Sequence, residues 1–371
     1  MPQLTQIKIS AFRNLRSVEL QPSNALNLIV GENGSGKTSL LESISVLAHG
    51  RSFRTHKFRR LINNAATGFT LFGTIRVGID PLEKRLGISR NTRGQLNIRV
   101  DGSPVYSAAE LATEFPLLVM NANSFQLLEG SSKYRRQFFD WLVFHVKHEF
   151  KTCWKSYVRC VKHRNSLLRS GKMSSTELIP WNRELCQLAV EITSMRQAVF
   201  TLFQEEFEQV FSDYCFDAGV TSTPALSFES GWKGEQTYEQ QLEEHLERDK
   251  KLGYTSIGSH KADLKIQCEK VPAVELLSRG QQKSVIVSLF MAEARVFSRL
   301  TGRKPVFLLD DLPSELDANN LSVVGQHLSQ LESQVFITAI DPDVITRCWP
   351  ESTLADLKMF HVEHGDIQVA T

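Results

Sequence analysis

The sequence contains no long apolar run, no paired cysteines and no pronounced excess of either charge. No stretch approaches the roughly 20 apolar residues that a membrane-spanning helix needs, and the opening MPQLTQIKIS lacks a secretory signal pattern. The six cysteines of the 371-residue chain are scattered without C-x-x-C spacing, which argues against a zinc or disulfide framework and favours reduced core thiols. We therefore expect a folded cytoplasmic protein that has no membrane partner.

Basic residues are concentrated in two parts of a chain whose formal net charge is only +2. The segment RSFRTHKFRR, residues 51–60, contains five lysines and arginines and no acid, and residues 132–169 are also heavily basic. The acidic stretch YEQQLEEHLERD compensates for them. Such runs often are solvated helix faces, but two basic runs dotted with aromatic residues also favour a partner with a phosphate backbone.

The N-terminal part of the sequence predicts a parallel core with an antiparallel sheet appended to it. QIKIS and ALNLIV have the pattern of strands, and KTSLLESISVLA that of a helix closed by His49 and Gly50. Short alternating runs follow, FTLFGTIRV, KRLGIS and LNIRV, with a tight-turn signal at Asp101-Gly102.

The middle of the chain predicts two packed antiparallel helices. Each helix shows a stripe of apolar residues at helical spacing, which indicates core packing. We interpret HVKH, residues 145–148, as a surface pair of histidines in the first helix, and RSGKMSSTELIP, residues 169–180, as a polar link. The two stripes are Phe150, Trp154, Tyr157, Val161 and Leu168, then Leu185, Leu188, Ile192, Met195, Val199 and Leu202.

The segment GENGSGKT matches the phosphate-binding pattern G-x-x-x-x-G-K-[ST] at every fixed position. It follows a predicted strand and opens a predicted helix, as the mechanism requires, because glycines let backbone N–H groups approach phosphates. Lys37 would reach the β- and γ-phosphates and support catalysis, and Thr38 would ligate Mg²⁺. The predicted ATP-binding residues are Gly31, Glu32, Asn33, Gly34, Ser35, Gly36, Lys37 and Thr38.

A second acidic element would complete the magnesium site. VFLLDD reads as a buried strand that ends in two carboxylates. We assign Asp310 to Mg²⁺, directly or through water, and Asp311 to orienting or deprotonating the attacking water.

The long separation between the phosphate loop and these acids argues against a compact GTPase or kinase. Just before the acids, LLSRGQQKS resembles the signature motif of ABC-type ATPases, which contacts ATP bound to a second subunit. Ser278, Arg279, Gly280 and Gln281 would form this contact. SELD, residues 314–317, resembles the D-loop that crosses the dimer seam, and it contains Asp317.

Taken together, these motifs resemble those of the RecF family of SMC-like recombination mediators along essentially the whole chain. The matching segments are IKISAFRNLRSVEL, GENGSGKTSLLESI, LAHGRSFRT, LLEGSSKYRRQFFDW, GSHKADL, LLSRGQQK and LLDDLPSELD. The resemblance implies an α/β fold: an ABC-type P-loop ATPase head, made of a mixed sheet and an antiparallel β subdomain, with an inserted helical lobe. The expected segments are 1–130 and 252–371 for the head and 131–251 for the lobe.

The resemblance also implies a function. Such a protein binds DNA, dimerises on ATP with Mg²⁺, hydrolyses ATP slowly, and with RecR and RecO helps to load RecA onto gapped DNA. Because they follow the helix of the phosphate loop, five basic residues are candidates for DNA contacts near the ATP-bearing face: Arg51, Arg54, Lys57, Arg59 and Arg60.

The sequence departs from the family pattern at two places. A Pro-Glu pair is usual in the segment that matches the Q-loop, where this chain has Ala122 and Asn123. Thr338 occupies the position of the switch histidine of transporter ATPases, which is consistent with slow turnover. The alternatives are a transporter ATPase subunit, disfavoured by Thr338 and the basic lobe, and an SMC-like defence or nuclease ATPase, for which the tail after Ile340 leaves little room.

Overall fold

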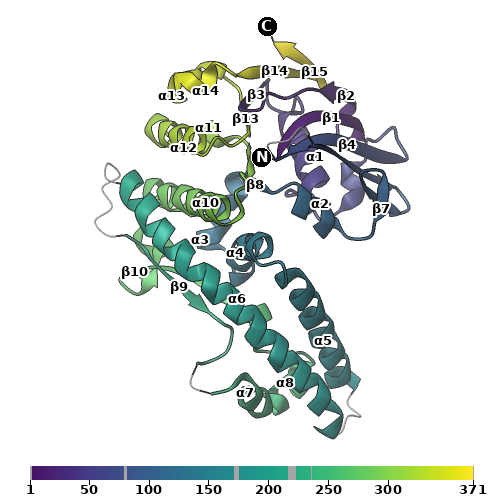
Figure 1. The fold of residues 1–371 in the computed structure, drawn as a ribbon, viewed down its shortest axis with the longest axis vertical. Coiled ribbons are helices and arrows are strands. Elements are labelled where there is room, and N and C mark those ends of the chain that lie inside the picture. The colour runs from purple at the N-terminus through teal and green to yellow at the C-terminus, as the bar shows by residue number, and fades with distance from the viewer. Residues whose placement is uncertain (1, 79–81, 171–174, 216–222, 235, 371) are drawn as a thin grey trace. The chain divides into compact units, whose positions relative to one another are not determined.

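A computed structural model describes residues 2–78, 82–170, 175–215, 223–234 and 236–370 (Figure 1). The chain forms two compact units, one containing residues 1–124 and 297–371 and the other residues 125–296. The boundary therefore falls inside helix α10 (Arg279–Thr301), and the signature-like segment lies in the second unit. The division at residues 130 and 251 that the sequence suggested stays a prediction.

The first unit contains a mixed sheet whose strand order is β15-β14-β3-β13-β12-β8. Neighbouring strands are parallel from β14 to β8, and only β15 is antiparallel. Parallel strands expose their carboxyl ends at one edge, so the loops that follow β3, β13, β12 and β8 meet there. The strands are β3 (Leu26–Val30), β8 (Leu117–Met120), β12 (Val306–Leu309), β13 (Val335–Ala339), β14 (Lys358–Glu363) and β15 (Asp366–Ala370).

The second sheet of this unit is entirely antiparallel, as the sequence predicts, with the order β2-β1-β4-β5-β6-β7. Helix α1 (Lys37–His49) contributes to one core with both sheets, and almost all of its residues are buried. Gly50 closes α1 in the left-handed conformation, with φ of 67°. The strands are β1 (Gln3–Phe12), β2 (Leu15–Leu20), β4 (Gly68–Val77), β5 (Leu82–Asn91), β6 (Leu96–Val100) and β7 (Ser103–Val105).

Further helices complete the first unit. They are η1 (Phe58–Leu61), α2 (Ala108–Glu114), η2 (Ala122–Phe125), α11 (Leu312–Glu315), α12 (Ala318–Gln330), α13 (Pro342–Cys348) and α14 (Glu351–Leu354). Among the residues that the structure describes, no helix is long and apolar enough to span a membrane.

The second unit is mainly helical, and its helices α5 and α6 run side by side (Figure 1). A small antiparallel sheet, β11-β10-β9, which the sequence did not predict, packs against α4 and α6. The elements are α3 (Gln126–Glu129), α4 (Ser132–Val146), α5 (Phe150–Ser170), α6 (Ser175–Cys215), β9 (Ala225–Glu229), α7 (Tyr238–Glu244), α8 (Leu246–Leu252), η3 (Ser259–Lys261), β10 (Asp263–Cys268), β11 (Val271–Pro272) and α9 (Ala273–Leu276).

Two predictions about the helices are wrong. The expected polar link largely belongs to helices, because α5 reaches Ser170 and α6 begins at Ser175 and includes Pro180; residues 171–174 lie outside the described residues. The expected surface pair of histidines is split, because α4 ends at Val146 and His145 is buried. His148 alone of the two is exposed. The described cysteines are free thiols, as predicted.

Candidate nucleotide site

The loop between β3 and α1 is held closely by the turn at Asn14 and by strand β14. A Cβ on Gly36, whose φ is 129°, would lie 2.9 Å from the Asn14 side chain, and a Cβ on Gly31 would lie 2.3 Å from the Val362 carbonyl oxygen. Asn14 also donates a hydrogen bond to the Ser35 carbonyl at 2.9 Å. Glycine is therefore required at positions 31 and 36 by close packing as well as by backbone conformation.

The loop places a buried ammonium group and an unsatisfied hydroxyl at its base. Lys37 Nζ donates hydrogen bonds to the carbonyls of Gly31 at 2.6 Å and Glu32 at 2.9 Å. Burial lowers the pKa of Lys37, and the charges of Asp311 and Asp310 partly oppose this. Ser35 Oγ is buried without a hydrogen-bond partner among the described residues. A phosphate group would satisfy both the cation and the hydroxyl.

Asp310 lies at the carboxyl end of β12 and receives two hydroxyl hydrogen bonds. Thr38 Oγ1 donates to Asp310 Oδ1 at 3.0 Å, and Thr338 Oγ1 donates to the same oxygen at 3.1 Å. Burial raises the pKa of Asp310, whereas the two hydroxyls and the charge of Arg54 lower it. Hydroxyl and carboxylate oxygens are ligands that Mg²⁺ prefers, so Thr38 and Asp310 fit a magnesium ion bound with a nucleotide.

Asp311 follows in the left-handed conformation, with φ of 57°, and its side chain is exposed. Its backbone N–H donates to Thr338 Oγ1 at 2.7 Å. Thr338 is only 1% exposed, so its hydroxyl fixes both acidic residues from the neighbouring strand β13. From the sequence, position 338 is notable only because it lacks the histidine of transporter ATPases. No local pattern predicts that the Thr338 hydroxyl contacts both Asp310 and Asp311.

A second cluster, which the sequence did not predict, links α1 to the basic loop. Glu42 of α1 is fully buried, and Arg13 binds its two carboxylate oxygens at 2.7 and 2.8 Å. Ser52 Oγ donates to Glu42 at 2.5 Å and accepts the backbone N–H of Arg54 at 2.9 Å. Arg54 Nη1 lies 3.7 Å from Glu42. These contacts hold Arg54 close enough for its charge to lower the pKa of Asp310.

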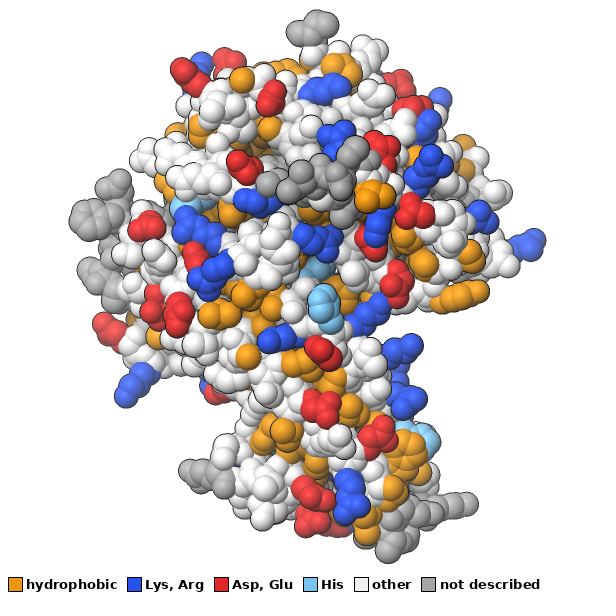
Figure 2. Space-filling view, viewed as in Figure 1, with side chains coloured by type: hydrophobic (Ala, Val, Ile, Leu, Met, Phe, Trp, Pro, Cys, Tyr) orange, Lys and Arg blue, Asp and Glu red, His pale blue; other side chains and the backbone are white. Residues whose placement is uncertain are grey.

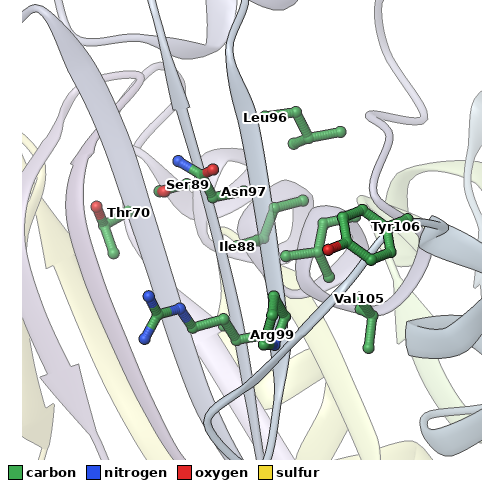
Figure 3. Close-up of a pocket in the computed structure, with 11 residues that line it drawn as sticks. Thr70, Ile88, Ser89, Leu96, Asn97, Arg99, Val105 and Tyr106 are labelled. Carbon is green, nitrogen blue, oxygen red and sulfur yellow. The ribbon is translucent and has the colours of Figure 1, made fainter.

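The other basic residues of this loop, Arg51, Lys57, Arg59 and Arg60, are exposed. Arg60 also lines a cavity of about 880 Å³ that includes Arg13, Asn14 and Ser39. Because Ser39 follows Thr38 and Asn14 holds the phosphate loop, this cavity adjoins the nucleotide site. Another cavity, of about 480 Å³, lies on the antiparallel sheet around Arg99 and Tyr106 and contains no residue of the phosphate loop (Figure 3).

The segment that matches the Q-loop lies at the same sheet edge, because β8 pairs with β12 and Asp310 N donates to the Met120 carbonyl at 2.9 Å. Ala122 and Asn123 are exposed there. Asn121 Oδ1 accepts a hydrogen bond from the backbone N–H of Asn123 at 2.9 Å. The turn therefore carries the amide side chains of Asn121 and Asn123 and no carboxylate at positions 122 and 123.

The signature-like residues begin the 23-residue helix α10 in the second unit. Ser278 and Gln281 cap the helix reciprocally: Ser278 N donates to Gln281 Oε1 at 2.9 Å and Gln281 N to Ser278 Oγ at 3.3 Å. Ser278, Arg279 and Gly280 are exposed, and Arg279 forms an ion pair with Glu129. In the first unit, Asp317 caps α12 by accepting the N–H of Asn320 at 2.8 Å.

Comparison with known proteins adds an independent line of evidence. Residues 3–366 match the family described as RecF/RecN/SMC N terminal domain. The chain is 57% identical to the DNA replication and repair protein RecF of Teredinibacter turnerae, with 100% of this chain and 97% of the relative covered. It is 45% identical to the protein of the same name from Cellvibrio japonicus, with 98% of each covered.

Solved structures show the same fold. A structure described as the recombination mediator protein RecF-ATP in the RecFOR pathway is similar with a TM-score of 0.86 and 24% identity, covering 100% of this chain and 98% of that one. An Smc head bound to the C-winged helix domain of ScpA is similar with a TM-score of 0.60 and 14% identity, covering 100% and 97%. The prediction of an ABC-type ATPase head with an inserted helical lobe is confirmed.

Proposed function

The chain belongs to the RecF family, and on this premise we propose that it is an ATP-dependent DNA-binding protein of recombinational repair. It binds ATP with Mg²⁺, dimerises in the ATP-bound state and hydrolyses ATP slowly, with stimulation by DNA. The observation that carries the proposal is the 3.0 Å contact between Thr38 and Asp310, because it joins the phosphate loop to the acid that a magnesium nucleotide requires.

The geometry of the loop and of the acids supports specific roles at the nucleotide. Lys37 and the loop amides hold the phosphates, and Thr38 and Asp310 hold Mg²⁺, which when bound neutralises developing phosphate charge. Asp311 is exposed beside this pair and is free to orient a water molecule. The cavity lined by Arg13, Asn14 and Ser39 receives the nucleoside.

The exposed start of α10 supports the proposed dimerisation. Its first N–H groups and the flanking Ser278, Arg279 and Gly280 form a site for an anion, since helix N-termini favour negative charge. We assign this site to the γ-phosphate held by a second subunit, with Gln281 as the cap that orders it and Asp317 near the seam.

DNA and protein partners are proposed from the relatives, whose names describe DNA replication and repair and the RecFOR pathway. The dimer would bring together two copies of the loop with Arg51, Arg54, Lys57, Arg59 and Arg60. With RecR and RecO, it would help load RecA onto gapped DNA in the cytoplasm.

Sedimentation of the protein with and without ATP and gapped DNA tests this proposal. We expect a monomer without nucleotide, a dimer with ATP, and a faster DNA-bound dimer with both. A chain that binds ATP but stays monomeric would contradict the cross-subunit site, and a chain that binds no ATP would overturn the proposed function.

A further inference from the structure

Helix α5 contains no acidic residue in any of its 21 positions. One face is buried and includes Phe150, Tyr157, Val161 and Leu168. The opposite face has a basic residue at almost every turn. We call these basic residues the α5 stripe: the half-buried Lys151 and the exposed Lys155, Arg159, Lys162 and Arg169. Their spacing places them on one side of the helix.

The stripe differs from Arg164 and Arg196, the two fully buried arginines of the second unit, whose charges are compensated. Arg164 and Asp249 are fully buried and bond at 2.7 Å, and Arg196 bonds Asp140 at 2.8 Å. In the described part of the chain, by contrast, no carboxylate forms an ion pair with Lys155, Lys162 or Arg169. These two pairs hold buried charges within the fold, whereas Lys155, Lys162 and Arg169 carry exposed charges.

Arg159 is the stripe's partial exception, since it lies 3.7 Å from Glu184 and remains 73% exposed. Figure 2 shows Lys and Arg side chains along the edge of the lobe where α5 runs. A face kept soluble by charge alone usually mixes both signs. A row of positive charges on a rigid helix is better suited to binding a partner that carries a row of negative charges.

The row continues beyond the helix. Arg169 packs against Gly253, where a Cβ would meet its Cγ at 3.0 Å. The next residue, Tyr254, is 42% exposed, and Lys261 Nζ lies 5.5 Å from the centre of its ring. A basic and aromatic patch therefore extends the α5 stripe at its C-terminal end.

We propose that the α5 stripe binds the phosphate backbone of duplex DNA; this rests on the proposed function, that the chain binds DNA. From Lys155 to Arg169 the helix rises about 21 Å at 1.5 Å per residue. A strand of duplex DNA places one phosphate per about 3.4 Å of axis, so the stripe can follow several successive phosphates. A straight, packed helix suits a stiff duplex better than a flexible single strand.

The test compares two variants that lose the same three charges. The first is Lys155→Gln, Lys162→Gln and Arg169→Gln, because glutamine keeps helix propensity close to that of lysine and arginine. The control is Arg93→Gln, Lys233→Gln and Lys270→Gln, which are exposed residues on other segments. Binding to a duplex oligonucleotide and to a single strand is measured over a salt series with ATP present.

We expect the α5 variant to flatten the salt slope for duplex DNA by about 2.7, at about 0.9 per phosphate contact, and to weaken binding on the order of a hundredfold at 0.1 M salt. The control should keep the wild-type slope, and both variants should bind ATP normally. If wild type binds no DNA, the proposed function fails. If wild type binds duplex and the α5 variant matches the control, or loses only single-strand binding, this inference fails alone.

Discussion

The hydroxyl of Thr38 lies 3.0 Å from Asp310 Oδ1 although 272 positions separate the two residues. The sheet order explains the contact: β3 and β12 flank β13, and all three are parallel, so the phosphate loop and the acids emerge at one edge. Thr338 of β13 donates to the same carboxylate from between them. The parallel topology therefore assembles the site.

Lys37→Met should weaken ATP binding by about 1.5–3 kcal/mol, or roughly 10- to 150-fold, because it removes a charge-assisted contact to phosphate. Isothermal titration calorimetry would measure this, with Lys57→Met as a control that removes an exposed lysine outside the phosphate loop. Unchanged affinity in Lys37→Met would show that the loop is not a phosphate site.

Thr338→Val should lower ATP hydrolysis while ATP binding stays within a few-fold, because the hydroxyl positions Asp310 and Asp311 without belonging to the phosphate loop. It should also lower the free energy of unfolding by about 1–3 kcal/mol, since the Asp311 N–H loses its acceptor. Thr338→Ser keeps the hydroxyl and should restore both quantities. Equal hydrolysis in the valine and serine variants would contradict the positioning role.

The sequence was sufficient to predict the parallel core, the antiparallel sheet and the approach of the phosphate loop to the acids. These predictions depend on local signals, such as the glycine pattern after ALNLIV and the carboxylates after VFLL. The clamp of Arg13 on Glu42 has no local signal, because its members lie on β1–β2 and α1 and meet only in the folded chain.

Tertiary context also overrides local patterns in the lobe. Within the stripe predicted for α6, Leu188 and Met195 are only half-buried, whereas Arg196 is fully buried because Asp140 and the Ser259 carbonyl satisfy it. Pro180 lies inside α6, where local rules predict a break. Such partners come from distant segments, so spacing alone cannot indicate them.

Two substitutions should separate dimerisation from hydrolysis. Asp311→Asn should bind ATP and accumulate as a dimer, because it impairs only the attacking water. Ser278→Arg should bind ATP as a monomer, because its bulk blocks the partner's phosphate, whereas Ser278→Ala loses the helix cap, about 1 kcal/mol, and should still dimerise. Light scattering with ATP distinguishes them, and equal dimerisation of Asp311→Asn and Ser278→Arg would exclude the cross-subunit site.

His260 should make the protein less stable in mild acid. Its Nδ1 lies 2.8 Å from the Tyr157 hydroxyl and its Nε2 3.0 Å from the Thr255 carbonyl, and burial lowers its pKa from 6.5 to about 4. The neutral form is favoured in the fold, so the stabilisation is complete above pH 6.5 and is lost as the pH falls towards 4.

The loss should reach about 3–3.5 kcal/mol, because the pKa is lowered from 6.5 to about 4 and each pKa unit corresponds to about 1.36 kcal/mol. Urea unfolding at several pH values would measure it. His260→Gln should be less stable at pH 7 and should show a shallower decline in acid. Parallel declines in the variant and the wild type would assign the acid sensitivity to other groups.

The loop after α1 gives the last prediction. Arg54→Ala with Arg59→Ala should flatten the salt slope for duplex DNA by at most about 1.8, which is about 0.9 for each residue that contacts one phosphate. Arg59 is exposed and forms no ion pair within the described residues. Arg59→Ala alone should therefore reduce the salt slope by about 0.9. Arg54 Nη1 also lies 3.7 Å from the carboxylate of Glu42, which partly compensates its charge. Arg54→Ala alone should therefore reduce the salt slope by less than Arg59→Ala does.

Linkage requires that DNA favour the ATP-bound dimer as strongly as ATP favours DNA binding, so these effects should be larger with ATP than without it. Combining the loop pair with the α5 variant separates the two surfaces. Independent phosphate contacts add in the slope, so the combined variant should lose both contributions. An unchanged slope in the folded loop variant would exclude this loop from the DNA site and leave the helical lobe around Lys155 and Lys162.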